Sequence, residues 1–172
     1  MSAEEEVREH SEHARDPFDK TVAGCMAIIA AMLAVVSVLG QHYNTEELLR
    51  QQQASDQWAF SQAKDIRRYI AQAEQDSLAQ MRGDGKVITR YAGDANKYEK
   101  QHSEIQEKAR DYEKERDESG RKARKFHFGE VFLEVAIVLS SLSILTKRRP
   151  LFFGGVAAAL IGVVWAMIGM VG

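Results

Sequence analysis

Hydrophobic residues are concentrated in three stretches of the chain, and charged residues are dense elsewhere. The first stretch lies within residues 17–40, the second within residues 126–146, and the third covers residues 151–171. As an α-helix, about 20 apolar residues are about 30 Å long, which matches the hydrocarbon thickness of a lipid bilayer. The pattern therefore predicts an all-α membrane protein with three transmembrane helices.

Local signals place the ends of these helices. Asp16 is a suitable N-cap for the first helix, and Pro17 is a suitable first helical residue. Residues 1–16 form an acidic polar tail, unlike the basic start of a cleaved signal peptide, so we expect the first helix to remain as an anchor. Only the segment KRRP, residues 147–150, separates the second helix from the third, which predicts a tight turn.

Residues 41–125 are rich in charge, and their apolar residues recur at alternating spacings of four and three, as in helices that pack along one stripe. The first stripe consists of Ala59, Ala63, Ile66, Ile70, Ala73 and Ser77. The second stripe consists of Tyr91, Ala95, Tyr98, His102, Ile105, Ala109 and Tyr112. A turn near residues 82–88 separates them, and Asn44 with Glu47 has the spacing of a capping box at a helix start. We therefore predict an extramembrane antiparallel coiled-coil hairpin; the alternative is a solvated, partly disordered loop.

Two aromatic residues, Trp58 and Phe60, flank Ala59 in this region. Each lies about 100° from Ala59 around a helix, so a hairpin with one packing face cannot easily bury both rings. Trp58 shares its side of the helix with Tyr69. We expect one ring to contact a second copy or another protein; alternatively, both rings lie flat across the other arm.

Small residues recur along two of the predicted transmembrane helices, and small residues let membrane helices approach closely. The third helix has Gly155, Ala159, Gly162, Ala166 and Gly169, and the first has Ala23, Ala27, Ala30, Ala34 and Ser37. These stripes pack either within one chain or between copies in a homo-oligomer. The candidate interaction residues are therefore Trp58, Ala59, Phe60, Ala63, Ile66, Tyr69, Gly155, Gly162 and Gly169.

Two acidic residues, Glu130 and Glu134, share one face of the second predicted transmembrane helix. A carboxylate inside a bilayer is costly and is a candidate for function, here in an ion or proton path. Such a path would need several copies, because transporters normally have more helices than three. The alternative is a glutamate near the interface that reaches water or pairs with Lys125.

Composition narrows the candidate chemistry. The formal net charge of -2 gives no reason to expect nucleic acid, and the single cysteine, Cys25, cannot form a disulfide within the chain. His10 and His13 lie at helical spacing in the acidic tail, but without cysteine ligands we expect a solvated segment rather than a zinc site. The sequence has no glycine-rich phosphate loop and no nucleophile motif, so we predict no enzyme activity, no cofactor and no metal site.

Lysine and arginine near the helix ends indicate the orientation in the membrane. Basic residues within 8–20 precede the uncharged run that begins at Thr21, and residues 147–149 are all basic. This predicts a cytoplasmic N-terminus and a periplasmic or extracellular hairpin. The basic residues within 121–125 disagree with the assignment, although long translocated regions tolerate such charge.

Several segments of the chain carry a resemblance. EHSEHA, QHYNTEELLRQQQASDQWAFSQAKDIR and LTKRRP occur in this order around the hydrophobic stretches. They resemble the bacterial membrane family named domain of unknown function forty-three thirty-seven, over essentially the whole chain and most specifically at ASDQWAFSQAK. The resemblance implies a multi-pass protein of the bacterial inner membrane and supplies no activity or catalytic residues.

These observations favour a non-enzymatic membrane scaffold or interaction protein that self-assembles through its helical hairpin and its Gly/Ala-rich helices. The expected partners are the lipid bilayer, further copies of the chain and an unidentified membrane protein. The alternative is an oligomeric transport or ion-conducting component that uses Glu130 and Glu134.

Overall fold

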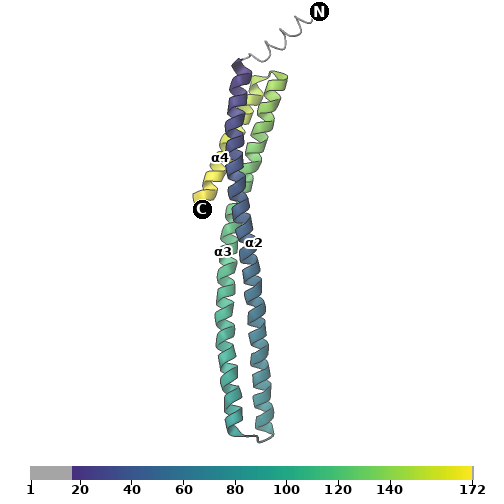
Figure 1. Ribbon diagram of the computed structural model, residues 1–172, viewed down its shortest axis with the longest axis vertical. Coiled ribbons are helices and arrows are strands. Elements are labelled where there is room, and N and C mark those ends of the chain that lie inside the picture. Colours follow the sequence, from purple (N-terminus) through teal and green to yellow (C-terminus); the bar gives the residue numbers. More distant parts are fainter. Residues whose placement is uncertain (1–16, 172) are drawn as a thin grey trace, which may run out of the picture. The chain divides into compact units, whose positions relative to one another are not determined.

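The computed structural model describes residues 17–171 and consists of three α-helices (Figure 1). Helix α2 covers Pro17–Gln80, α3 covers Gly85–Thr146 and α4 covers Arg149–Val171. Each helix contains a stretch that is long enough and apolar enough to cross a membrane. The all-helical class and the three candidate transmembrane segments predicted from the hydrophobic pattern are therefore confirmed.

Both long helices continue through positions where the sequence suggests a break. Asn44 lies inside α2, so the helix start expected there from the capping-box spacing is wrong. Gly93 and Gly120 lie inside α3. One glycine costs a helix only about 1 kcal/mol relative to alanine, and the long flanking helical runs offset this cost.

The turn between α2 and α3 covers residues 81–84, which include Arg82, Gly83 and Asp84 of the RGDG segment. At the end of α2, Arg82 has a φ of 50°, in the left-handed region, and the N–H of Gly83 donates to the carbonyl oxygen of Leu78 at 2.9 Å. This is the hydrogen bond of a Schellman motif, which satisfies a carbonyl at the end of a helix. Asp84 caps α3, because its Oδ1 accepts the N–H of Lys86 at 2.9 Å.

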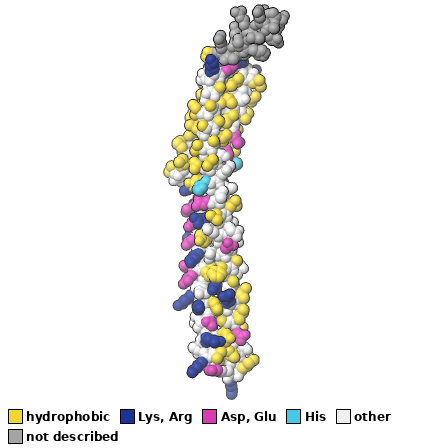
Figure 2. All heavy atoms as spheres, viewed as in Figure 1, with side chains coloured by type: hydrophobic (Ala, Val, Ile, Leu, Met, Phe, Trp, Pro, Cys, Tyr) yellow, Lys and Arg dark blue, Asp and Glu magenta, His cyan; other side chains and the backbone are white. Residues whose placement is uncertain are grey.

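The chain divides into two compact units. Unit 1 contains residues 17–44 and 120–171 of the described chain, and unit 2 contains residues 45–119. On the face seen in Figure 2, hydrophobic side chains dominate unit 1, whereas unit 2 carries many Lys, Arg, Asp and Glu side chains. The apolar surface of unit 1 suits a hydrocarbon environment, and the charged surface of unit 2 suits water.

The core of unit 1 is formed by apolar residues from all three helices. It comprises Ile29, Val36, Phe126, Leu133, Ala136, Ala159 and Ala166. The ring of Phe126, which is 1% exposed, stacks on Tyr43 at a centroid distance of 5.6 Å. A Cβ added at Gly40 would lie 3.3 Å from the Cβ of Phe126, so α2 and α3 approach closely at this level.

Helices α3 and α4 are in backbone contact. A Cβ at Gly162 would lie 2.8 Å from the carbonyl oxygen of Gly129, and a Cβ at Gly129 would lie 2.9 Å from that of Gly162. Gly155 packs against Ser140 in the same way, and Gly169 packs against the Phe126 ring. The small-residue stripe of α4 is therefore buried within one chain, which is one of the two alternatives left open by the sequence. The alanines of the first stripe differ, because Ala23, Ala27, Ala30 and Ala34 are exposed.

The start of α2 is connected to the turn between α3 and α4. Asp19 forms an ion pair with Lys147, whose φ of 54° lies in the left-handed region. The Arg149 guanidinium lies over the Phe18 ring at 5.7 Å, and Phe18 makes an edge contact with Phe152. These contacts hold this end of the three-helix unit together.

Candidate functional site

Unit 2 consists of one segment each of α2 and α3, which lie side by side (Figure 1). On α3, every position of the stripe predicted from the sequence is buried or half-buried. The α2 residues buried against it are small, namely Ala54, Ser61 and Ala71. The two helices therefore bring an aromatic and apolar stripe of α3 against a small and polar face of α2.

Most of the stripe predicted on α2 does not face α3. We call its first five residues the outer stripe, namely Ala59, Ala63, Ile66, Ile70 and Ala73; the sixth predicted residue, Ser77, is half-buried. All five residues are exposed, with Ile66 at 60% and Ile70 at 56%. The expectation that the outer stripe packs on the other arm of the hairpin is therefore wrong. Ser61 lies about 180° from Ile70 around the helix, so the face that contacts α3 is opposite the outer stripe.

The structure separates the two aromatic residues beside Ala59. Trp58 is half-buried, and its Nε1 donates a hydrogen bond to Oε1 of Glu113 on α3 at 2.9 Å. Phe60 is 51% exposed, with the Nζ of Lys64 at 5.1 Å from its ring centroid. Trp58 therefore contacts its own chain, and Phe60 borders the outer stripe.

Replacing Trp58 by Phe removes the hydrogen bond to Glu113 but keeps an aromatic ring. We expect unit 2 to lose about 1 kcal/mol of stability, the usual net contribution of one such bond. Thermal unfolding followed by far-UV circular dichroism should show the corresponding fall in melting temperature. Lys108→Ala, on the exposed side of α3, is the control; an unchanged melting temperature for Trp58→Phe would contradict the assigned role of the bond.

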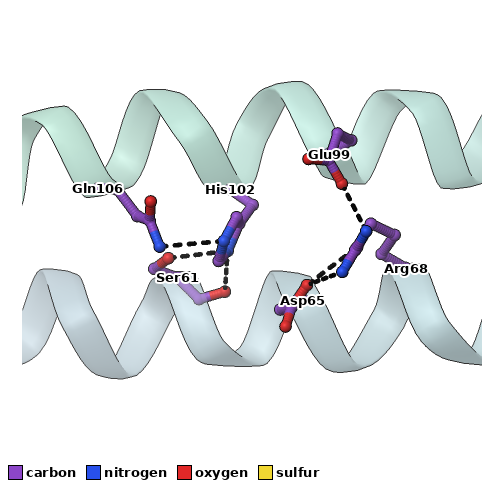
Figure 3. A network of polar contacts seen from close by, with 6 residues as sticks. All are labelled: Ser61, Asp65, Arg68, Glu99, His102 and Gln106. Carbon is purple, nitrogen blue, oxygen red and sulfur yellow. Dashed lines mark hydrogen bonds and ion pairs between the residues drawn. The ribbon is translucent and has the colours of Figure 1, made fainter.

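A buried polar group connects the two helices at Ser61 (Figure 3). The Nδ1 of His102 lies 2.9 Å from the Oγ and 3.1 Å from the carbonyl oxygen of Ser61. Because a carbonyl oxygen only accepts, we assign the proton to Nδ1, and Nε2 then accepts from the Gln106 amide at 3.0 Å. In this tautomer all three side chains have partners.

The same geometry argues against nucleophilic catalysis at Ser61. A serine nucleophile must donate its proton to the imidazole, whereas here the imidazole donates toward Ser61. Ser61 is also only 1% exposed, so a substrate has no access to its Oγ. The group is best explained as a contact that positions α3 on α2.

Next to this group, Arg68 forms ion pairs with one acid on each helix (Figure 3). Its Nη2 lies 2.7 Å from Asp65 on α2, and its Nη1 lies 2.8 Å from Glu99 on α3. Desolvation lowers the pKa of the Arg68 guanidinium, but the hydrogen bond and charge of Asp65 and the charge of Glu99 outweigh it, so the pKa is raised. Arg68 is therefore a permanent positive charge that joins the two helices.

In unit 1, the two glutamates of the second candidate transmembrane segment have different surroundings. Glu130 is half-buried, with its Oε2 at 3.6 Å from the Nδ1 of His127. Glu134 is exposed on α3, and its carboxylate forms no ion pair with any of the described residues, Lys125 included. It lies about 12 Å along the helix from Phe126. A role for these glutamates in ion or proton movement stays a prediction.

Unit 1 also has an open apolar groove of about 440 Å³. Its walls come mainly from α2 and α4 and include Ile28, Met32, Val163 and Met170. In a bilayer, lipid chains would fill such a groove, and its lining offers no cluster of polar groups that would select a specific ligand.

Within residues 17–171, no group of three or more His, Cys, Asp or Glu side chains is placed to hold a metal ion. Cys25 is a free, half-buried cysteine in the first candidate transmembrane segment. His10 and His13 lie outside the described residues.

The comparison with protein families identifies the chain without assigning it an activity. Residues 18–172, nearly the whole chain, match the family model described as domain of unknown function, DUF4337. The chain belongs to the DUF4337 family. No curated protein and no solved structure matches it. Membership of DUF4337 agrees with the resemblance found at ASDQWAFSQAK, and the function must be argued from the surfaces of the molecule.

Proposed function

We propose that the chain is a membrane-anchored, non-enzymatic scaffold that self-assembles through the outer stripe of α2. The observation that supports the proposal most is the exposure of Ile66 and Ile70 in a unit that carries many charged side chains on the face seen in Figure 2. Burying an aliphatic side chain of this size is favourable by about 1.5–3 kcal/mol, so an exposed run of them favours association.

We further propose that unit 2 is an antiparallel coiled-coil hairpin outside the bilayer. Three observations support this proposal. The predicted stripe of α3 is buried or half-buried, a turn joins α2 directly to α3, and ion pairs connect the two helices of unit 2. Beside the Arg68–Glu99 pair, Arg50 contacts Glu115 at 3.0 Å. The resemblance to the DUF4337 family implies the bacterial inner membrane, and we place the protein there. The basic residues at its helix ends favour a cytoplasmic N-terminus.

A second copy is the partner that the stripe fits best. The described part of α3 in unit 2 has no large exposed hydrophobic residue, whereas α2 has several near the stripe, including Leu49, Phe60 and Tyr69. The exposed apolar side chains that another copy offers on the helices of this unit therefore lie on α2, at and near its own outer stripe. A contact between two outer stripes has two-fold symmetry. The spacing of four and three is also the spacing that a packed helix requires.

The double substitution Ile66→Glu/Ile70→Glu tests this proposal. We expect the wild-type chain in mild detergent to have the mass of a dimer or larger assembly, and the variant to associate about 100-fold more weakly. Light scattering coupled to size-exclusion chromatography measures both masses.

A matched control adds two glutamates on the other helix, with Asn96→Glu/Ser103→Glu on the exposed side of α3. The control should associate like the wild type. A monomeric wild type, or a double variant that associates as strongly as the control, would contradict assembly through the outer stripe.

A further inference from the structure

We infer that two copies join along the outer stripe in parallel and in register, so that Asp56 of one copy faces Asp56 of the other. This inference rests on the proposed self-assembly. It adds the relative orientation of the two copies and names Asp56 as the residue that limits the strength of their association. Asp56 lies three residues before Ala59, where the spacing of four and three places it on the same side of α2 as the outer stripe. It is exposed.

The parallel orientation follows from the way the chain connects the two units. Residues 45 and 119, at the ends of unit 2, are continuous with helices of unit 1 that contain candidate membrane-crossing segments. The turn between α2 and α3 is the part of unit 2 farthest along the chain from both connections. Two copies anchored in one bilayer therefore present α2 in the same direction, and the shared membrane raises their effective concentration.

The in-register alignment follows from the two-fold symmetry and from the side chains beside the stripe. In a parallel pair each stripe residue meets its own counterpart, so that Ile66 and Ile70 form the hydrophobic centre. The positions that flank this centre bring Gln62 near Arg67 of the second copy and Tyr69 near Glu74 of the second copy. Neither flanking pair has like charges, and both offer hydrogen bonds.

Asp56 is the exception to this complementarity. The Nε2 of Gln52 donates to Oδ1 of Asp56 at 2.9 Å, but no cation of the described chain forms an ion pair with Asp56. In a parallel pair its carboxylate faces an identical carboxylate at a packing position, which weakens the association. In an antiparallel pair Asp56 would face a different residue, and this penalty would be absent.

The orientation can be measured with single cysteines in the full-length chain, reconstituted in vesicles after Cys25→Ala. Ala59→Cys and Ala73→Cys are made separately and oxidised with copper phenanthroline. The two positions are about 21 Å apart along the helix, so both can meet their own counterparts only in a parallel, in-register pair. We expect covalent dimers for both. Ser103→Cys, on α3, is the control for random collisions and should give none.

Asp56→Asn is the second measurement, with Asp56→Glu as its matched control. We expect Asp56→Asn to strengthen self-association about 10-fold in mild detergent, and Asp56→Glu to leave it unchanged, because only the first removes the repulsion.

The outcomes separate this inference from the proposed function. A dimer in which at most one of the two cysteine positions cross-links overturns the parallel alignment and leaves self-assembly intact. If both positions cross-link but Asp56→Asn does not strengthen self-association, the role of Asp56 is overturned and the parallel alignment stands. A strictly monomeric chain overturns both proposals.

Discussion

Gly162→Leu is expected to separate α4 from α3 and to destabilise unit 1 by more than about 3 kcal/mol. Even a Cβ at this position would lie 2.8 Å from the carbonyl oxygen of Gly129 and 3.0 Å from Cγ of Leu133. A backbone oxygen on a packed helix cannot move aside, so the leucine side chain has to force the helices apart. The close van der Waals packing that holds membrane helices together is then lost along the whole contact.

The measurement is unfolding by sodium dodecyl sulfate in mixed micelles, followed by the fluorescence of Trp165. Trp165 lies on α4 with its ring 5.7 Å from that of Phe128 on α3, so its emission reports on the contact between these helices. A Trp58→Phe background leaves Trp165 as the one remaining tryptophan of the sequence.

Gly154→Leu is the matched control on the same helix. Gly154 is exposed, and a Cβ there would meet only Cδ1 of Leu139, at an ordinary 3.8 Å. The control should unfold close to the parent protein. Equal unfolding midpoints for Gly162→Leu and Gly154→Leu would show that the backbone contact between α3 and α4 does not stabilise the unit.

Phe126→Ala is expected to destabilise unit 1 by about 3–5 kcal/mol, the usual cost of removing a fully buried phenylalanine ring. Phe126 connects all three helices of the unit, because its side chain packs on Tyr43 and Gly40 of α2 and on Gly169 of α4. Its removal leaves a cavity among the three helices, and packed surroundings relax only partly into such a cavity.

The same fluorescence titration measures this change, with Phe153→Ala as the matched control. Phe153 is 66% exposed on α4, so its truncation removes few packing contacts. We expect an unfolding midpoint near that of the parent for Phe153→Ala and a clearly lower one for Phe126→Ala. Similar losses for the two variants would contradict the central position of Phe126.

The hydrophobic pattern predicted most of the helical architecture. Three apolar stretches of membrane-spanning length are separated by charged residues, and the structure has a long helix through each of them. The stripe on α3 was also predicted, because its large residues, such as Ile105 and Tyr112, leave one clear apolar side on that helix.

The α2 half of unit 2 was mispredicted because that helix has two sides that could pack. The outer stripe is the more apolar side, so apolar spacing selected it. The side that contacts α3 relies instead on Ser61, Arg68 and Trp58, which pair with specific groups on α3. Spacing on one helix carries no information about polar partners on another helix.

The sequence by itself determined the helical class, the three candidate membrane segments and the apolar stripes, because length, charge and spacing are properties of the chain read in order. Only the tertiary structure decided that α2 turns its polar side to α3, that the glycines of α4 are used inside one chain and that Ile66 and Ile70 remain exposed. The physical reason is that these outcomes depend on which side chains of two helices fit and satisfy one another in space.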